Sequence, residues 1–104
     1  MPDPHAEQLL WFLFGGSRGG INRLRIIELL KKQPYNTNQI AEFLDMDYKS
    51  IQHHLNVLEK NNLITKNGEK YGVLFDISNY LKSNLDAYNK VKLKVSSNFE
   101  NELF

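Results

Sequence analysis

Polar side chains recur at the spacing of one helix face between residues 48 and 56. Steps of three and four residues place this stripe opposite the apolar Ile51 and Leu55. Amide and imidazole groups of this length can reach the edges of DNA bases, and a glutamine can bind adenine through two hydrogen bonds. An ordinary solvated helix surface is the alternative. We expect the stripe and the neighbouring Ser50 to contact DNA; its members are Tyr48, Lys49, Gln52, His53 and Asn56.

Two lysines further along the chain could hold the phosphate backbone. Lys66 and Lys70 flank Asn67-Gly68, a dipeptide that favours a tight type I′ hairpin turn. Lysines beside such a turn would position the protein on DNA without recognising its sequence. Glu69 lies between them and reduces the local positive charge, so we expect a modest contribution.

A glycine-rich segment, Gly15–Gly20, contains four of the chain's six glycines and also Arg18. Such a segment can offer backbone N–H groups to a phosphate, or it can end one helix and connect it to the next. The connector is favoured, because the segment matches no nucleotide-binding motif and follows no strand. Arg18 and the later Arg23 are nevertheless expected DNA contacts.

The sequence gives little support to catalysis or metal binding. Without cysteine, disulfides, thiolate metal sites and cysteine nucleophiles are excluded. His53 and His54 are adjacent, so their side chains diverge by about 100° on a helix and cannot chelate one metal ion well. No Ser–His–Asp pattern or pair of catalytic carboxylates is visible, since Asp45 and Asp47 are explained as turn and cap residues. We expect neither an enzyme nor a cofactor.

The elements that carry these residues follow from capping and apolar periodicity. Asn36 and Gln39 form a capping-box pattern, Asp47 and Ser78 can cap helices, and apolar residues change to alternate spacing after residue 62. The predicted elements are helices over about 4–14, 21–33, 36–44, 48–61 and 79–95, with a hairpin over about 63–77. This order predicts a mostly α protein with a small β-hairpin: one winged helix-turn-helix domain over residues 1–104, its helix-turn-helix at about 36–61.

The two terminal helices are expected to form a dimer interface. Leu9 to Phe14 is apolar on every side, and a helix of this kind needs cover all round. A second copy of a short chain is the natural second cover. The residues expected at this interface are Leu10, Trp11, Phe14, Leu81, Leu85 and Tyr88.

Composition sets the broad class. The 104 residues carry 13 basic and 12 acidic side chains, for a formal net charge of +1. A uniformly basic coat is therefore absent, and DNA binding would require the positive charge to gather on one face. The longest apolar run has about six residues, against about 20 for a membrane-spanning helix. With no basic segment at the start, a small, soluble, cytoplasmic protein is expected.

Three stretches together resemble the ArsR-type winged helix-turn-helix transcription regulators: Arg23–Ile27, Asn36–Leu44 and Ser50–Leu58. The resemblance runs from about Ile21 to Phe75 and has most of its weight in Gln52-His53-His54-Leu55. It implies a homodimer whose recognition helices enter successive major grooves of a palindromic site. It also implies a repressor released by an inducer, and a His54 that packs at the core edge.

The sequence departs from the metal-sensing branch of that family, and its likeness is nearer to archaeal members. Thr37–Leu44 contains no cysteine, and Leu81–Val95 contains no histidine, so metal sensing is not expected. A different class of function stays open: a winged helix can bind protein inside a larger complex, and a net charge of only +1 is compatible with that.

Overall fold

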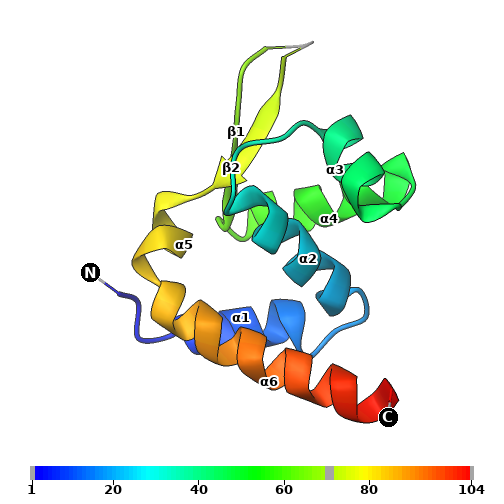
Figure 1. Ribbon diagram of the computed structural model, residues 1–104. Helices are drawn as coiled ribbons and strands as arrows, with labels where there is room; N and C mark the ends of the chain where they lie inside the picture. Colours follow the sequence, from blue (N-terminus) through cyan, green and yellow to red (C-terminus); the bar gives the residue numbers. More distant parts are fainter. Residues whose placement is uncertain (1, 70–71, 104) are drawn as a thin grey trace.

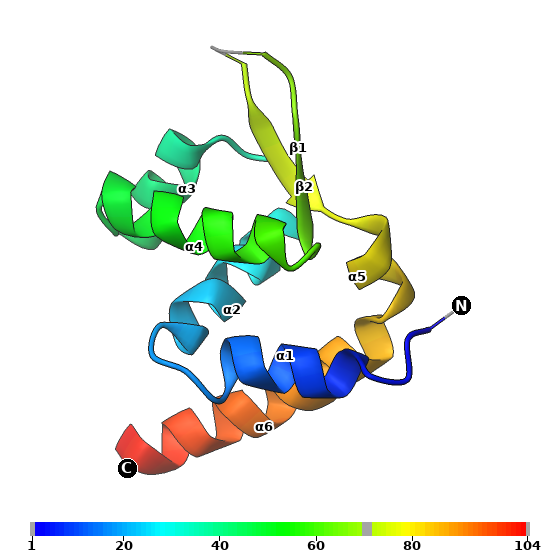
Figure 2. The same ribbon diagram turned by 180° about the vertical axis from the view of Figure 1, so that it is seen from behind.

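The computed structural model describes residues 2–69 and 72–103, the last six of these as backbone only. The elements in chain order are α1 (Ala6–Phe14), α2 (Gly20–Leu30), α3 (Thr37–Leu44), α4 (Tyr48–Lys60), β1 (Ile64–Asn67), β2 (Leu74–Ile77), α5 (Asn79–Ser83) and α6 (Leu85–Leu103). Figures 1 and 2 show α1 and α6 side by side at one end of the molecule, with the hairpin projecting from the other. Helices α2, α3 and α4 lie between them. The predicted fold class, a winged helix-turn-helix with flanking terminal helices, is confirmed.

The helix-turn-helix begins at the predicted caps. The Asn36 side chain accepts the Gln39 N–H at 2.8 Å, and the Gln39 side chain accepts the Asn36 N–H at 2.9 Å. At the start of α4 an Asp47 oxygen accepts the Ser50 N–H at 2.8 Å. Between the helices, Asp45 adopts a left-handed conformation with φ 53°, which turns the chain sharply. Local side-chain chemistry therefore fixes both helix starts.

One continuous core joins the terminal helices to the helix-turn-helix. Four residues expected at a dimer interface lie in this core and are fully buried within a single chain: Leu10, Phe14, Leu81 and Tyr88. That part of the prediction is wrong, because α1 packs along α6 and against α2, and these side chains lie in the core that the packed helices of one chain enclose. The Phe14 and Tyr88 rings meet edge to face with centroids 5.8 Å apart. Of the expected set, Trp11 is exposed and Leu85 half-buried.

The N-terminus is tied to the second half of the chain. Helix α1 begins at Ala6, two residues after the predicted start, and the Asp3 carboxylate accepts the His5 N–H at 2.9 Å just before it. The same carboxylate accepts the Tyr80 hydroxyl at 2.6 Å, and the Asp3 N–H donates to Asn84 Oδ1 at 2.8 Å. Burial and this hydrogen bond raise the pKa of Tyr80 to about 12. Asn84 also separates α5 from α6, where a single helix was predicted.

The hairpin differs from the predicted two-residue turn. Strands β1 and β2 pair antiparallel from Ile64 opposite Ile77 to Asn67 opposite Leu74, where the pairing ends. The chain turns later than predicted: the Gly72 N–H donates to the Glu69 carbonyl at 2.6 Å. The predicted strand residues Lys70 and Tyr71 lie outside the described residues. On its other side β2 pairs through Phe75 with Tyr35, which holds the wing against the loop before α3.

The glycine-rich segment permits a close crossing of α1 and α2, as expected of a connector. A Cβ on Gly20 would lie 2.1 Å from the carbonyl oxygen of Phe14. Gly19 has φ 84°, a left-handed conformation that other residues rarely adopt. Glycine is therefore required at both positions, whether or not a phosphate binds.

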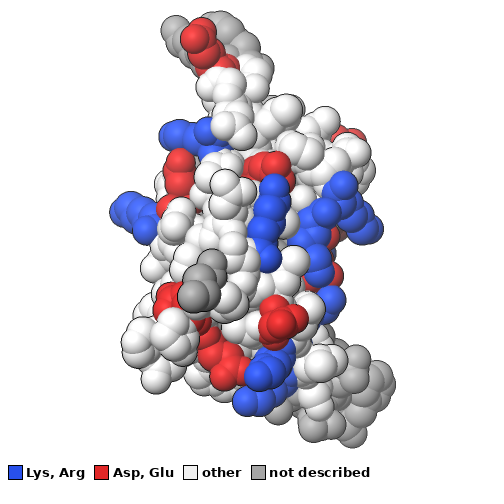
Figure 3. Space-filling model, turned by 90° about the vertical axis from the view of Figure 1, so that its left-hand side faces the viewer, with Lys and Arg blue, Asp and Glu red and all other residues white. Residues whose placement is uncertain are grey.

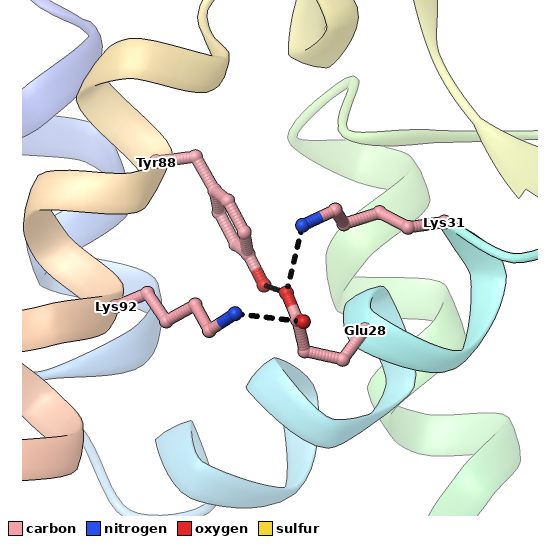
Figure 4. Close-up of polar contacts among 4 residues, drawn as sticks. All are labelled: Glu28, Lys31, Tyr88 and Lys92. Carbon is pink, nitrogen blue, oxygen red and sulfur yellow. Dashed lines mark hydrogen bonds and ion pairs between the residues drawn. The ribbon is translucent and has the colours of Figure 1, made fainter.

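Polar contacts of Glu28 join α2 to α6 (Figure 4). The Glu28 carboxylate accepts the Tyr88 hydroxyl at 2.6 Å and Lys92 Nζ at 2.8 Å, with Lys31 Nζ 3.3 Å away. Burial acts to raise the pKa of Glu28, but these donors outweigh it and lower that pKa overall. The terminal helix is thereby fastened to the helix that supports the helix-turn-helix.

Within residues 2–69 and 72–103, none of the helices has the length and apolar character to span a bilayer. Among the residues whose side chains are described, 2–69 and 72–97, there is no group of three acidic or histidine side chains placed to hold a metal ion.

Candidate nucleic-acid interface

The outward face of α4 presents the predicted stripe to solvent. Tyr48, Lys49, Gln52, His53 and Asn56 are all exposed, while Ile51, His54, Leu55 and Leu58 are buried on the opposite face. The face was assigned from helical spacing alone, and its exposure confirms that assignment. Whether these side chains contact DNA stays a prediction.

Ser50 has a local role at the start of α4. Its hydroxyl donates to Asp47 Oδ2 at 2.8 Å while its N–H donates to Oδ1 of the same carboxylate. Hydrogen bonds from the Ser50 N–H and hydroxyl lower the pKa of Asp47, so this cap stays ionised at neutral pH. Ser50 is half-buried, and both of its hydrogen-bond donors bind the capping residue Asp47. A contact between Ser50 and DNA stays a prediction.

The turn between α3 and α4 is held by an arginine that the sequence reasoning did not single out. Arg25 Nη2 donates to the Leu44 carbonyl at 3.0 Å, and Arg25 Nη1 donates to Asn22 Oδ1 at 3.2 Å. This carbonyl belongs to the last turn of α3, where backbone acceptors lack helical partners. The signal available in the sequence was the Arg23-Leu24-Arg25 spacing, which places the two arginines on different sides of α2.

The wing lysines are only partly described. Lys66 is exposed on β1, with its Nζ 4.0 Å from Glu59 Oε1 at the end of α4. A phosphate contact by Lys66 would compete with this carboxylate. The other expected wing contact, Lys70, lies outside the described residues.

The two arginines expected near the glycine-rich segment differ in their exposure to solvent. Arg18 is exposed on the connection before α2, and its DNA contact stays a prediction. Arg23 is buried, with 5% of its surface accessible, so its predicted DNA contact is wrong. Its guanidinium is used inside the protein, donating from Nε to the Leu13 carbonyl at 2.9 Å and from Nη2 to Ser17 Oγ.

Surface charge is mixed on the side of the molecule shown in Figure 3. Basic and acidic side chains alternate there among uncharged ones, without a patch of one sign. This agrees with the formal net charge of +1 and shows that positive charge does not cover the molecule as a whole.

Part of the chain is similar to a known protein family. Residues 22–66 match the family model described as "Bacterial regulatory protein, arsR family". This range covers α2 from Asn22 onward, the helix-turn-helix, and the first strand of the wing as far as Lys66. A comparison with curated proteins found no match.

Solved structures share the fold at low sequence identity. Reduced HlyU from Vibrio cholerae is 16% identical, with a TM-score of 0.61 over 85% of this chain and 84% of that one. The homodimeric winged helix-turn-helix DNA-binding domain of Mb0332 from Mycobacterium bovis is 20% identical, with a TM-score of 0.58 over 96% and 89%.

A third similar structure contains DNA. It is ZitR from Lactococcus lactis in complex with DNA, 21% identical, with a TM-score of 0.55 over 76% of this chain and 56% of that one. The match over residues 22–66 and the shared winged helix-turn-helix fold support a likeness to the ArsR-type regulators.

Proposed function

We propose that this protein binds double-stranded DNA as a homodimer, placing α4 of each copy in the major groove, and that it represses the genes it binds. The observation that carries the proposal is the exposed stripe on α4, whose opposite face is anchored in the core. An α-helix fits the major groove, and side chains on its outward face are the ones that reach base edges. The ZitR complex supports the proposal, because a protein of the same fold binds DNA.

The start of α4 suits an approach to phosphate. Asp47 caps the helix through its side chain, which leaves Tyr48 and Lys49 exposed in the first turn. The helix dipole, and those first-turn N–H groups that Asp47 does not bind, favour an anion at this end. We infer that the first turn sets the position of the helix, and that Gln52 and His53, one turn later, distinguish bases.

The homodimer is supported by a separate apolar surface. Trp11 is 40% exposed, Phe12 63% and Leu93 71%, and Trp11 lines a shallow groove with Leu93, Lys94 and Ser97 between α1 and α6. The related Mb0332 domain is homodimeric. A two-fold dimer would present two copies of α4, which favours a palindromic operator with half-sites about 34 Å apart.

Repression and release by an inducer follow the family resemblance. A dimer held on a promoter by two recognition helices would block access to it, and a promoter–reporter fusion with and without the gene measures the direction of regulation. The class of the inducer is left open.

Binding-site selection followed by a salt titration tests the central proposal. The purified protein is incubated with random duplexes, and the enriched sequence is then measured by fluorescence anisotropy at increasing salt. We expect a palindromic consensus and a log–log salt slope with a magnitude of several units, since each phosphate contact contributes about one. Failure to enrich any sequence, together with a flat salt dependence, would contradict DNA binding and favour a protein-binding winged helix.

A further inference from the structure

Arg23 and His54 form a buried contact between α2 and the recognition helix. Arg23 Nη1 lies 3.4 Å from His54 Nδ1, and only 5% of Arg23 and 8% of His54 are accessible. The remaining guanidinium donors bind Leu13 and Ser17, so one arginine joins the end of α1, the connection to α2, and α4. This contact lies on the opposite side of α4 from the polar stripe.

The chemistry of this contact fixes the protonation state of His54. Arginine has only donors, so Nδ1 of the imidazole must act as the acceptor and the ring must be neutral. A proton on Nδ1 would place two donors and two positive charges face to face in a buried site. Arginine keeps its charge in such surroundings, so the histidine is the group that must change.

The ring has little room to move within the core. A Cβ on Gly19 would lie 2.8 Å from His54 Cε1 and 3.3 Å from Arg23 Nη1, so the backbone of Gly19 already packs against both. With Gly19 on this side of the ring, we infer that a protonated imidazole separates from the guanidinium through a shift of α4 or of the connection before α2. Either movement would alter the position of the exposed stripe.

We propose that Arg23 and His54 are a positioning pair for the recognition helix, and that protonation of His54 releases α4 and weakens DNA binding at acidic pH. The inference rests on the proposed DNA binding. It adds control by pH to the proposed DNA-binding face of α4.

The charged groups around the pair favour the neutral form of His54 in the folded protein. Burial lowers the pKa of His54, and the positive charges of Arg23 on α2 and His53 on α4 lower it further. The connection before α2 contributes the backbone of Gly19 and the neutral Ser17 hydroxyl. Below the unfolded-state value of about 6.5, the unfolded chain binds this proton more readily than the native chain, so stability falls as the pH falls.

The exposed His53 would act in the opposite direction, since its protonation adds a positive charge near DNA. The test therefore uses His53→Asn as the background. Fluorescence anisotropy with the selected duplex gives Kd at about pH 7.5 and about pH 5.0 for His53→Asn and for His53→Asn/His54→Asn. Asparagine keeps an acceptor near the position of Nδ1 but does not titrate. His5→Asn/His53→Asn is the matched control, because His5 is exposed and lies outside the site.

We expect Kd of the His53→Asn protein to rise at least about threefold between these pH values, with at most one proton released on binding. The control should show the same rise, and the variant lacking His54 should show none. An equal rise with and without His54 would overturn the inference. No binding by the wild type at the higher pH would instead overturn the proposed function.

A measurement without DNA keeps the inference testable if His54→Asn does not fold. NMR of the histidine ring Cε1–H groups in the wild-type protein follows each protonation against pH. His54 should titrate below the ordinary histidine value of about 6.5, and backbone amides of α4 and of residues 13–19 should shift with it. Titration of His54 at or above about 6.5 would overturn the proposal.

Discussion

Gln52 and Lys49 lie on the exposed face of α4 but offer different chemistry. The Gln52 amide can make a paired donor and acceptor contact with one base, worth about 1–3 kcal/mol against the wrong base. The Lys49 ammonium lies near the helix start, where we expect it mainly to add attraction to phosphate. We expect Gln52→Ala to relax the selected consensus at one base pair per half-site, and Lys49→Ala to weaken binding to all sequences. Binding-site selection and anisotropy measure the two effects.

Circular dichroism provides the control for these variants, because both side chains are exposed and should be dispensable for folding. An unchanged consensus for Gln52→Ala and for His53→Ala would show that α4 does not recognise bases through this face.

At the scale of the elements, the crossing of α1 and α2 depends on Gly20. A methyl group there would meet the Phe14 carbonyl at 2.1 Å, and backbone atoms cannot move aside as a side chain can. We expect Gly20→Ala to lower the free energy of unfolding by at least about 2 kcal/mol, measured by urea denaturation.

Gly16 provides a matched control in the same segment. A Cβ at Gly16 would have its nearest neighbour at 3.6 Å, an ordinary contact. Gly16→Ala should therefore change stability by less than about 0.5 kcal/mol. Equal losses for the two variants would show that the segment is sensitive for another reason.

The wing is a second element whose contribution can be separated. If Lys66 contacts phosphate, Lys66→Ala should weaken specific and random DNA binding alike and make the salt slope shallower by about one unit per site. Glu59 lies 4.0 Å from the ammonium group and competes for it, so Glu59→Gln should strengthen binding. Salt titrations of both variants test the pair, and opposite signs are the expected result. A loss confined to the specific site would place Lys66 away from the phosphate backbone.

At the scale of the whole molecule, the exposed apolar side chains of α1 and α6 predict the dimer surface. Leu93 is 71% exposed, and burying a large apolar side chain stabilises an interface by about 1.5–3 kcal/mol. We expect Leu93→Glu to convert a dimer to a folded monomer in sedimentation equilibrium. Leu74→Glu, an exposed position on the wing, should leave the dimer intact. A wild-type protein that is monomeric at micromolar concentration would contradict this assignment.

The sequence by itself determined most of the elements and which face of α4 is exposed. Caps at Asn36, Asp47 and Ser78 act within a few residues of themselves, so local patterns were sufficient to find them. The exposed stripe of α4 followed from helical periodicity for the same reason. Element boundaries were less exact, as the late hairpin turn and the break at Asn84 show.

Only the tertiary structure decided which side chains of the terminal helices stay outside and what Arg23 does. Leu10 and Tyr88 have the same apolar character as exposed interface residues, but α1, α2 and α6 cover them within one chain. Arg23 has a side chain of the type that binds DNA. It lies at the crossing of α1 and α2, however, where Leu13, Ser17 and His54 surround it. Such outcomes depend on contacts between residues far apart in the chain, and these arise only when the helices pack.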